Sequence, residues 1–79
     1  MDYDKEKVDE VVLALLYLTS STDQYATRAW KGLNSEALDR LYAKGLIGNP
    51  RLKSPTVEIS KEGATLAKEL FAKYFGNEE

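Results

Sequence analysis

The sequence predicts a small single-domain protein of the α+β class, in which helices pack around a short antiparallel sheet. The chain has 79 residues, of which 43% are hydrophobic, and this is enough for one core. Apolar residues recur at helical spacing in three stretches. Between the second and third stretches, a segment with two prolines separates two short β-type sequences. We therefore expect one domain over residues 1–79, with residues 1–3 and 77–79 as frayed ends.

The composition argues against catalysis and metal binding. The chain contains no cysteine and no histidine, which removes thiolate nucleophiles, imidazole bases and the usual zinc ligands. Its glycines stand singly, so no phosphate-binding loop is indicated. We expect no catalytic residue, no cofactor and no metal, and therefore not an enzyme.

The longest apolar run, Val11 to Leu18, is far shorter than the roughly 20 residues of a membrane span. The acidic, mixed-charge start is unlike a secretory signal. These features predict a cytoplasmic protein without a membrane partner.

The first helix is expected from Asp4 to about Leu18. Its acidic start suits the positive end of a helix dipole. An apolar stripe at helical spacing predicts the face that packs on the core; its members are Val8, Val11, Val12, Leu15, Leu16 and either Tyr17 or Leu18. Leu13 and Ala14 widen this face, so we expect the helix to be buried on more than one side.

Residues 21–33 allow two interpretations. Ser21 or Thr22 could cap a short helix, or the stretch could be a loop that leads to a strand at residues 28–31, ended by Gly32. Thr27 and Trp30 suit a strand, whereas Gln24 and Ala26 suit a helix. We favour the loop and strand.

The second helix is expected from Asn34 to Lys44, with Asn34 or Ser35 as its N-cap. Gly45 follows at the position where the left-handed backbone conformation commonly ends a helix. The next segments, residues 46–48 and 56–60, predict a β-hairpin around a turn-rich loop, with Val57 and Ile59 facing inward.

The last helix is expected to begin after Ser60, which is a good N-cap, and to end at Gly76. Its apolar positions recur at helical spacing and are Ala64, Leu66, Ala67, Leu70, Phe71, Tyr74 and Phe75.

Residues 38–70 carry a pattern that resembles the second half of winged helix-turn-helix domains of the MarR and PadR type. The pattern is Leu38-x-x-Leu41-x-x-x-Gly45-Leu46-Ile47, a turn-rich gap, and then Val57-x-Ile59-Ser60-x-x-Gly63. The resemblance implies a winged-helix-like fold with three main helices and a β-hairpin wing between the second and third. The whole chain, with Arg28-Ala29-Trp30-Lys31-Gly32 before the second helix, also resembles a family of small bacterial proteins of unknown function.

Positive charge is concentrated in the middle of the chain. Residues 28–53 carry six cations against Glu36 and Asp39, a net charge of +4. This predicts binding to double-stranded DNA through phosphate contacts, and the candidate residues are Arg28, Lys31, Ser35, Arg40, Lys44, Arg51 and Lys53. Two features oppose it: Glu36 lies four residues before Arg40, as in a surface ion pair, and a DNA-reading helix needs a supporting helix that only residues 21–33 could supply.

The alternative is a protein-interaction or homodimerisation module. Phe71, Tyr74 and Phe75, together with the wide face of the first helix, offer more apolar area than a thin domain covers. The resembled families pair through terminal helices. Trp30 is either a core residue, which we favour, or a partner anchor. A third hypothesis is a small-molecule sensor with a pocket under the first helix.

Overall fold

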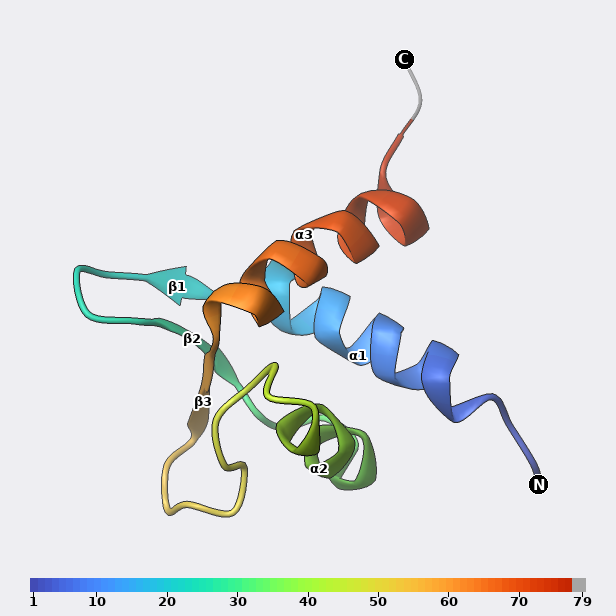
Figure 1. The fold of residues 1–79 in the computed structure, drawn as a ribbon, viewed down its shortest axis with the longest axis horizontal. Coiled ribbons are helices and arrows are strands. Elements are labelled where there is room, and N and C mark those ends of the chain that lie inside the picture. Colours follow the sequence, from blue (N-terminus) through green and yellow to red (C-terminus); the bar gives the residue numbers. More distant parts are fainter. Residues whose placement is uncertain (78–79) are drawn as a thin grey trace.

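The computed structural model describes residues 1–77 as a small α+β protein with three helices and a three-stranded antiparallel sheet (Figure 1). In chain order the elements are α1 (Lys5–Leu18), β1 (Ser21–Thr22), β2 (Thr27–Trp30), α2 (Ser35–Ala43), β3 (Thr56–Ile59) and α3 (Lys61–Phe75). The class, the three helices and their order agree with the sequence-based expectation. None of the helices within residues 1–77 combines the length and the apolar character needed to span a lipid bilayer.

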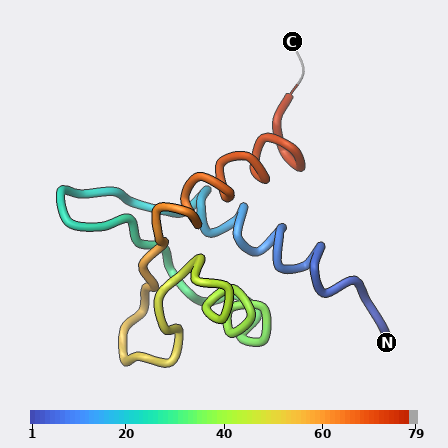
Figure 2. Tube along the Cα trace, viewed as in Figure 1, coloured from blue at the N-terminus to red at the C-terminus, as the bar shows by residue number. Residues whose placement is uncertain are grey.

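The molecule is flat, with extents of 36 × 35 × 19 Å. α1 lies between α2 and α3, and the sheet closes one end of the three helices (Figure 1). The chain trace in Figure 2 shows α1 and α3 close together near the sheet and diverging toward the two termini. The core therefore lies where the three helices meet the inner face of the sheet.

α1 begins and ends where the sequence predicted, but its core-facing side differs. Asp4 is the N-cap and accepts a hydrogen bond from the backbone N–H of Lys7. The buried residues are Asp9, Val12, Leu13, Ala14 and Leu16. Three members of the predicted core stripe are not in the core: Val11 and Leu15 are only half-buried, and Leu18 is 60% exposed. α1 contacts both α2 and α3, and Val11, Leu15 and Leu18 lie outside the core cluster that these elements share.

Residues 21–30 form a β-hairpin, which confirms the loop-and-strand interpretation over the helix. β1 and β2 are antiparallel, with Thr22 opposite Thr27. The turn is organised by Asp23, whose Oδ1 accepts hydrogen bonds from the backbone N–H groups of Tyr25 and Ala26. β2 begins one residue earlier than expected, and no helix precedes α2 between residues 21 and 33.

α2 confirms the predicted caps. The Asn34 side chain accepts from the backbone N–H of Ala37, and Gly45 adopts a φ of 74° just past the helix. The left-handed conformation at Gly45 turns the chain toward the sheet, where Ile47 enters the core.

The predicted hairpin between residues 46–48 and 56–60 is corrected by the structure. β3 pairs along its whole length with β2. Residues 46–48 meet β3 only through the bridge between Ile47 and Ile59 and two flanking backbone hydrogen bonds. The hairpin does not extend because the segment leads directly into the proline-containing loop 49–55, and prolines cannot donate ladder hydrogen bonds. Val57 and Ile59 face inward as expected.

α3 starts where Ser60 caps it by accepting from the backbone N–H of Gly63. The Ser60 hydroxyl also donates to the carbonyl of Gly45, at 2.8 Å. A Cβ atom at Gly63 would clash with the carbonyl oxygen of Leu46, so glycine is required for this close approach. Gly76 is the C-cap. Residues 78–79 of the expected frayed tail lie outside the described residues.

Candidate binding surfaces

The two predicted DNA-contacting cations of α2 turn toward α1. Arg40 donates hydrogen bonds from Nε to both carboxylate oxygens of Asp9, at 2.9 and 2.8 Å, and from Nη2 to Oδ1 at 2.8 Å. Lys44 Nζ lies 3.9 Å from Asp9 Oδ2. Asp9 is only 2% exposed, and a buried carboxylate requires such partners. The hydrogen bond to Asp9 raises the pKa of Arg40. The expected surface pair with Glu36 is therefore wrong, because Arg40 uses its guanidinium to neutralise Asp9.

Three more of the predicted cations are bound by the chain itself. Arg51 Nη2 lies 2.6 Å from Asp39 Oδ2. Arg28 lies 3.6 Å from Asp23 and 3.8 Å from Glu58 on the outer face of the sheet. Lys31 Nζ donates to the carbonyl oxygens of Pro50 and Leu52, at 2.7 and 2.5 Å, and so holds the loop 49–55 together. Of the predicted set, only Ser35 and Lys53 have side chains without a hydrogen-bond or ion-pair partner within residues 1–77.

The predicted DNA-contacting residues do not form one surface. Lys31, Ser35 and Arg51 share a cleft of about 310 Å³ between the start of α2 and the loop 49–55. Arg28 belongs to the outer face of the sheet, and Arg40 and Lys44 face Asp9. Arg28 also shares a pocket with Asn49, Leu52 and Ser54, so the cations divide between the surroundings of the loop 49–55 and the side of α2 that faces Asp9.

Trp30 is not a core residue, contrary to the interpretation we favoured. Its side chain is 61% exposed on the outer face of the sheet, opposite Thr56. The indole ring covers Gly32, where a Cβ atom would clash with it. Alternation along β2 explains the outcome, because Ala29 points inward and is 1% exposed, so its neighbour must point outward.

Of the predicted aromatic interface residues, Phe71, Tyr74 and Phe75 form one cluster with Tyr17 of α1, and Trp30 lies apart from it on the sheet. The ring centroids of Tyr17 and Phe71 are 5.7 Å apart, those of Phe71 and Phe75 are 5.4 Å apart, and those of Tyr74 and Phe75 are 6.4 Å apart. The Tyr74 hydroxyl donates a hydrogen bond to Glu10, which raises the pKa of Tyr74. Phe75 is 45% exposed. The cluster therefore joins α1 to α3 and remains partly open to solvent.

The two long helices, α1 and α3, have two opposite sides. On one side, which we call the leucine groove, Leu13 of α1 and Leu66 of α3 line a pocket. Leu15 lies two residues after Leu13, and Phe75 lies nine residues after Leu66. At about 100° per residue, Leu15 is roughly opposite Leu13 around α1, and Phe75 is roughly opposite Leu66 around α3. We call the opposite side the outer apolar face, and it comprises Val11, Leu15 and Leu18 of α1 with Phe71 and Phe75 of α3.

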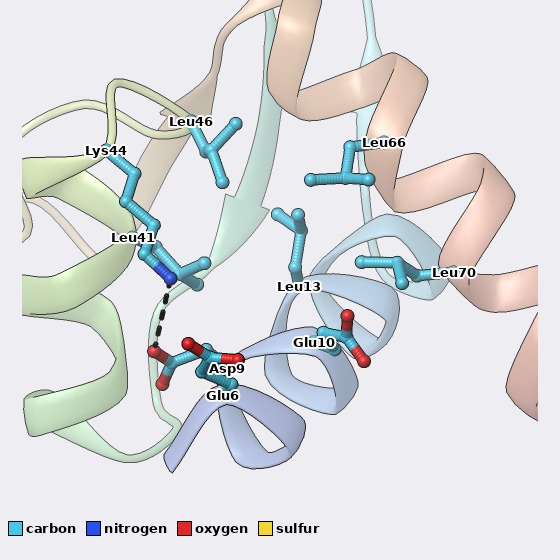
Figure 3. A pocket seen from close by; sticks show the side chains of 9 residues that line it. All are labelled: Glu6, Asp9, Glu10, Leu13, Leu41, Lys44, Leu46, Leu66 and Leu70. Atoms are coloured by element: carbon cyan, nitrogen blue, oxygen red, sulfur yellow. Dashed lines mark ion pairs between the residues drawn. The ribbon is translucent and has the colours of Figure 1, made fainter.

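The leucine groove has a volume of about 270 Å³ and lies between α1, α2 and α3 (Figure 3). Its wall combines leucines with charged groups, which are Glu6, Asp9, Glu10, Leu13, Leu41, Lys44, Leu46, Leu66 and Leu70. This pocket is where the third hypothesis placed one, under the first helix. Within residues 1–77 its carboxylates do not form a cluster suited to holding a metal ion.

Sequence reasoning missed the burial of Asp9, and it anticipated the outer apolar face only in part, through Phe71, Phe75 and the wide face of the first helix. Asp9 is spaced three, four and seven residues from the buried Val12, Leu13 and Leu16, a spacing that places it on the core side of the helix. A signal for the outer face was also present, because Val11, Leu15 and Leu18 make a second apolar stripe on the same helix.

The fold and these surfaces define a small α+β domain with two separate apolar sites, a groove and an open face. The chain belongs to the family described as a domain of unknown function, DUF6429, whose model matches residues 4–77. It is 40% identical over 75 residues to the uncharacterised protein y4hR of Sinorhizobium fredii (strain NBRC 101917 / NGR234), covering 95% of this chain and 97% of that protein. No solved structure matches the chain. The expected membership of a small bacterial family of unknown function is thereby confirmed.

Proposed function

We propose that this domain is a non-enzymatic protein-binding module that forms a homodimer through the outer apolar face. The observation that carries the proposal is that α1 is apolar on two sides while the core uses only one. Val11, Leu15 and Leu18 are spaced by four and three residues, the spacing of seam positions in paired helices. Leu18 is 60% exposed and Phe75 45% exposed, so this face still has apolar surface to remove from water.

The shape of the domain favours a second copy as the partner. Stable domains bury apolar surfaces between packed layers, and this flat molecule is only 19 Å thick. A two-fold axis through the outer apolar face would place Leu15 and Leu18 against the same residues of the second copy and so supply the missing layer. The aromatic cluster at Phe71 and Phe75 would extend the contact onto α3.

A winged-helix-like nucleic-acid-binding module is the second candidate. It is supported by the antiparallel order of β2, β3 and residues 46–48, and by the positions of Lys31, Arg51 and Lys53 in or beside the loop 49–55. It ranks second because the paired guanidinium of Arg40 is directed to Asp9 and because a β-hairpin occupies the position of a supporting helix.

Sedimentation of the full chain tests the homodimer. We expect a mass of twice the 8.9 kDa chain at tens of micromolar and above. Leu18→Glu should shift the mass to that of one chain without loss of helicity, because a charge on an apolar contact is costly to desolvate. Leu52→Glu is the matched control, since Leu52 is as exposed, at 62%, as Leu18, at 60%, but lies in the loop 49–55; it should leave the dimer intact. A wild-type monomer at hundreds of micromolar would contradict the proposal.

A random-sequence DNA duplex at low salt separates the two candidates. Under the homodimer proposal we expect no binding at tens of micromolar. Micromolar binding that is lost in Lys31→Ala and Lys53→Ala, with a log–log salt slope of about −3 for three phosphate contacts, would instead support the nucleic-acid candidate.

A further inference from the structure

The leucine groove has the features of a ligand site that is independent of the outer apolar face. Its floor is made of leucines from three parts of the chain: Leu13 of α1, Leu41 of α2 with Leu46 just after that helix, and Leu66 and Leu70 of α3. Leu46 and Leu66 are half-buried, so part of the floor is reachable from solvent (Figure 3). A volume of about 270 Å³ is just below the usual range for small-ligand pockets, about 300–1,000 Å³.

The rim of the groove is acidic. Glu6, Asp9 and Glu10 line it from the first two turns of α1, and among the described residues Lys44 is the only cation that lines it. Arg40 neutralises Asp9 together with Lys44, and the ion pair of Lys44 with Asp9 is drawn in Figure 3.

The other two carboxylates of the rim are less well compensated. Glu10 accepts a hydrogen bond from the hydroxyl of Tyr74, and Lys73 Nζ lies 3.9 Å from Glu10 Oε1. Glu6 has no ion-pair partner within the described residues. Because Glu6 and Glu10 are one helical turn apart, they repel each other, and a cation placed between them would relieve that repulsion.

We propose that the leucine groove binds a small amphiphilic amine. The aliphatic chain lies on the leucine floor, where it is removed from water, and the ammonium group lies at the rim between Glu6 and Glu10. A carboxylate head group would meet the negative charge of Glu6, and a neutral head group would gain no charge-assisted hydrogen bond there. The groove is on the opposite side of α1 and α3 from the outer apolar face, so this site does not depend on the proposed homodimer.

Three probes with one tail and different head groups test the proposal: octylamine, octanol and octanoate, each below its micellar concentration at neutral pH. Titrations followed by amide chemical shifts of the full chain should show saturable changes at Leu46 and Leu66 with octylamine. We expect octylamine to bind at least tenfold more tightly than octanoate, with octanol between them. Equal or tighter binding of octanoate would overturn the proposal, as would shifts confined to Leu15, Leu18 and Phe75 on the outer apolar face.

Two substitutions assign the head-group contact. Glu6→Gln should weaken octylamine binding by about three- to tenfold and leave octanol binding unchanged, because it removes charge at an exposed position without changing shape. Glu62→Gln is the matched control, since Glu62 is an exposed carboxylate of α3 that does not line the groove; it should leave both affinities unchanged. Unaltered octylamine affinity in Glu6→Gln overturns the proposed ammonium position. Binding of a lysine-containing leucine peptide without binding of octylamine overturns the small-molecule assignment in favour of a protein partner.

Discussion

The two sides of α1 carry the same kinds of apolar residue, but only one of them forms part of the core. One side places Leu13 and Leu16 in the core, where they are 1% and 0% exposed. The other side carries Val11, Leu15 and Leu18, which do not pack against the core, and Leu18 is 60% exposed. The residues on both sides are aliphatic and recur at helical spacing, so the difference comes from what packs against them. Apolar periodicity predicts which positions are removed from water, but it does not predict whether the residues that bury them belong to the same chain or to a partner.

The largest predicted effect is the difference in unfolding free energy between a truncation on the core side of α1 and one on its outer side. Leu16→Ala should lower the free energy of unfolding by about 3 to 5 kcal/mol, because it removes transfer energy and leaves a cavity beside fully buried neighbours. Leu15→Ala should cost less than about 1 kcal/mol in the monomer, since its side chain is already partly hydrated. Urea unfolding followed by circular dichroism at low micromolar concentration measures both.

Equal costs for the two substitutions would show that Leu15 is a core residue and would remove the basis of the outer apolar face. Raising the protein concentration sharpens the comparison, because the wild-type dimer then forms and only the deficit of the outer substitution relative to wild type should grow.

The helix boundaries were predictable because they depend on local chemistry. Asp4, Asn34 and Ser60 cap the helices by accepting hydrogen bonds from N–H groups three residues ahead, and Gly45 supplies a left-handed turn that other residues rarely adopt. None of these interactions requires a distant part of the chain. The same holds for the turn at Asp23, although its sequence also allowed a helix.

The partners of side chains were less predictable because they depend on tertiary packing. The alternation of β2 predicts that Ala29 and Trp30 face opposite ways, and residue size favoured Trp30 inside. In the structure Ala29 is the buried one, at 1% exposed, and Trp30 is 61% exposed. Arg40 has an acid one turn away on its own helix, yet it binds Asp9 from α1, whose burial makes that pair obligatory. Charge along the sequence therefore marked the cations of the candidate site without showing that most of them were already paired.

The second prediction compares two carboxylates on the first turns of α1. Asp9→Ala should cost about 2 kcal/mol, because it removes charge-assisted hydrogen bonds made by a buried carboxylate. Glu6→Ala should change stability by less than about 0.5 kcal/mol, since Glu6 is exposed and makes no ion pair within residues 1–77. Chemical unfolding of the two variants measures the difference.

A third variant separates the charge pair from packing. Asp9→Leu combined with Arg40→Leu should recover part of the loss, because a buried ion pair replaced by apolar residues of similar size is often tolerated. If Asp9→Ala proves as mild as Glu6→Ala, Asp9 is not the buried anchor that directs Arg40 and Lys44 away from the surface, and the argument that ranks DNA binding second fails with it.

The smallest predicted effect is the pH dependence of stability that comes from Asp23 in the β1–β2 turn, outside the helical core. The backbone N–H groups of Ala26 and Tyr25 donate to Asp23 and lower its pKa below the ordinary value of 3.8, and Arg28 adds to this. A carboxylate whose pKa is lowered by folding stabilises the fold above its ordinary pKa, and this stabilisation is lost as the pH falls through the folded-state value. Asp23→Asn keeps an acceptor oxygen but cannot titrate, so the difference in unfolding free energy between wild type and Asp23→Asn should shrink on acidification from about pH 6 to about pH 2. A carboxyl chemical-shift titration of Asp23 checks the cause directly, and a midpoint at or above the ordinary value would mean that the turn does not hold its carboxylate in the ionised form.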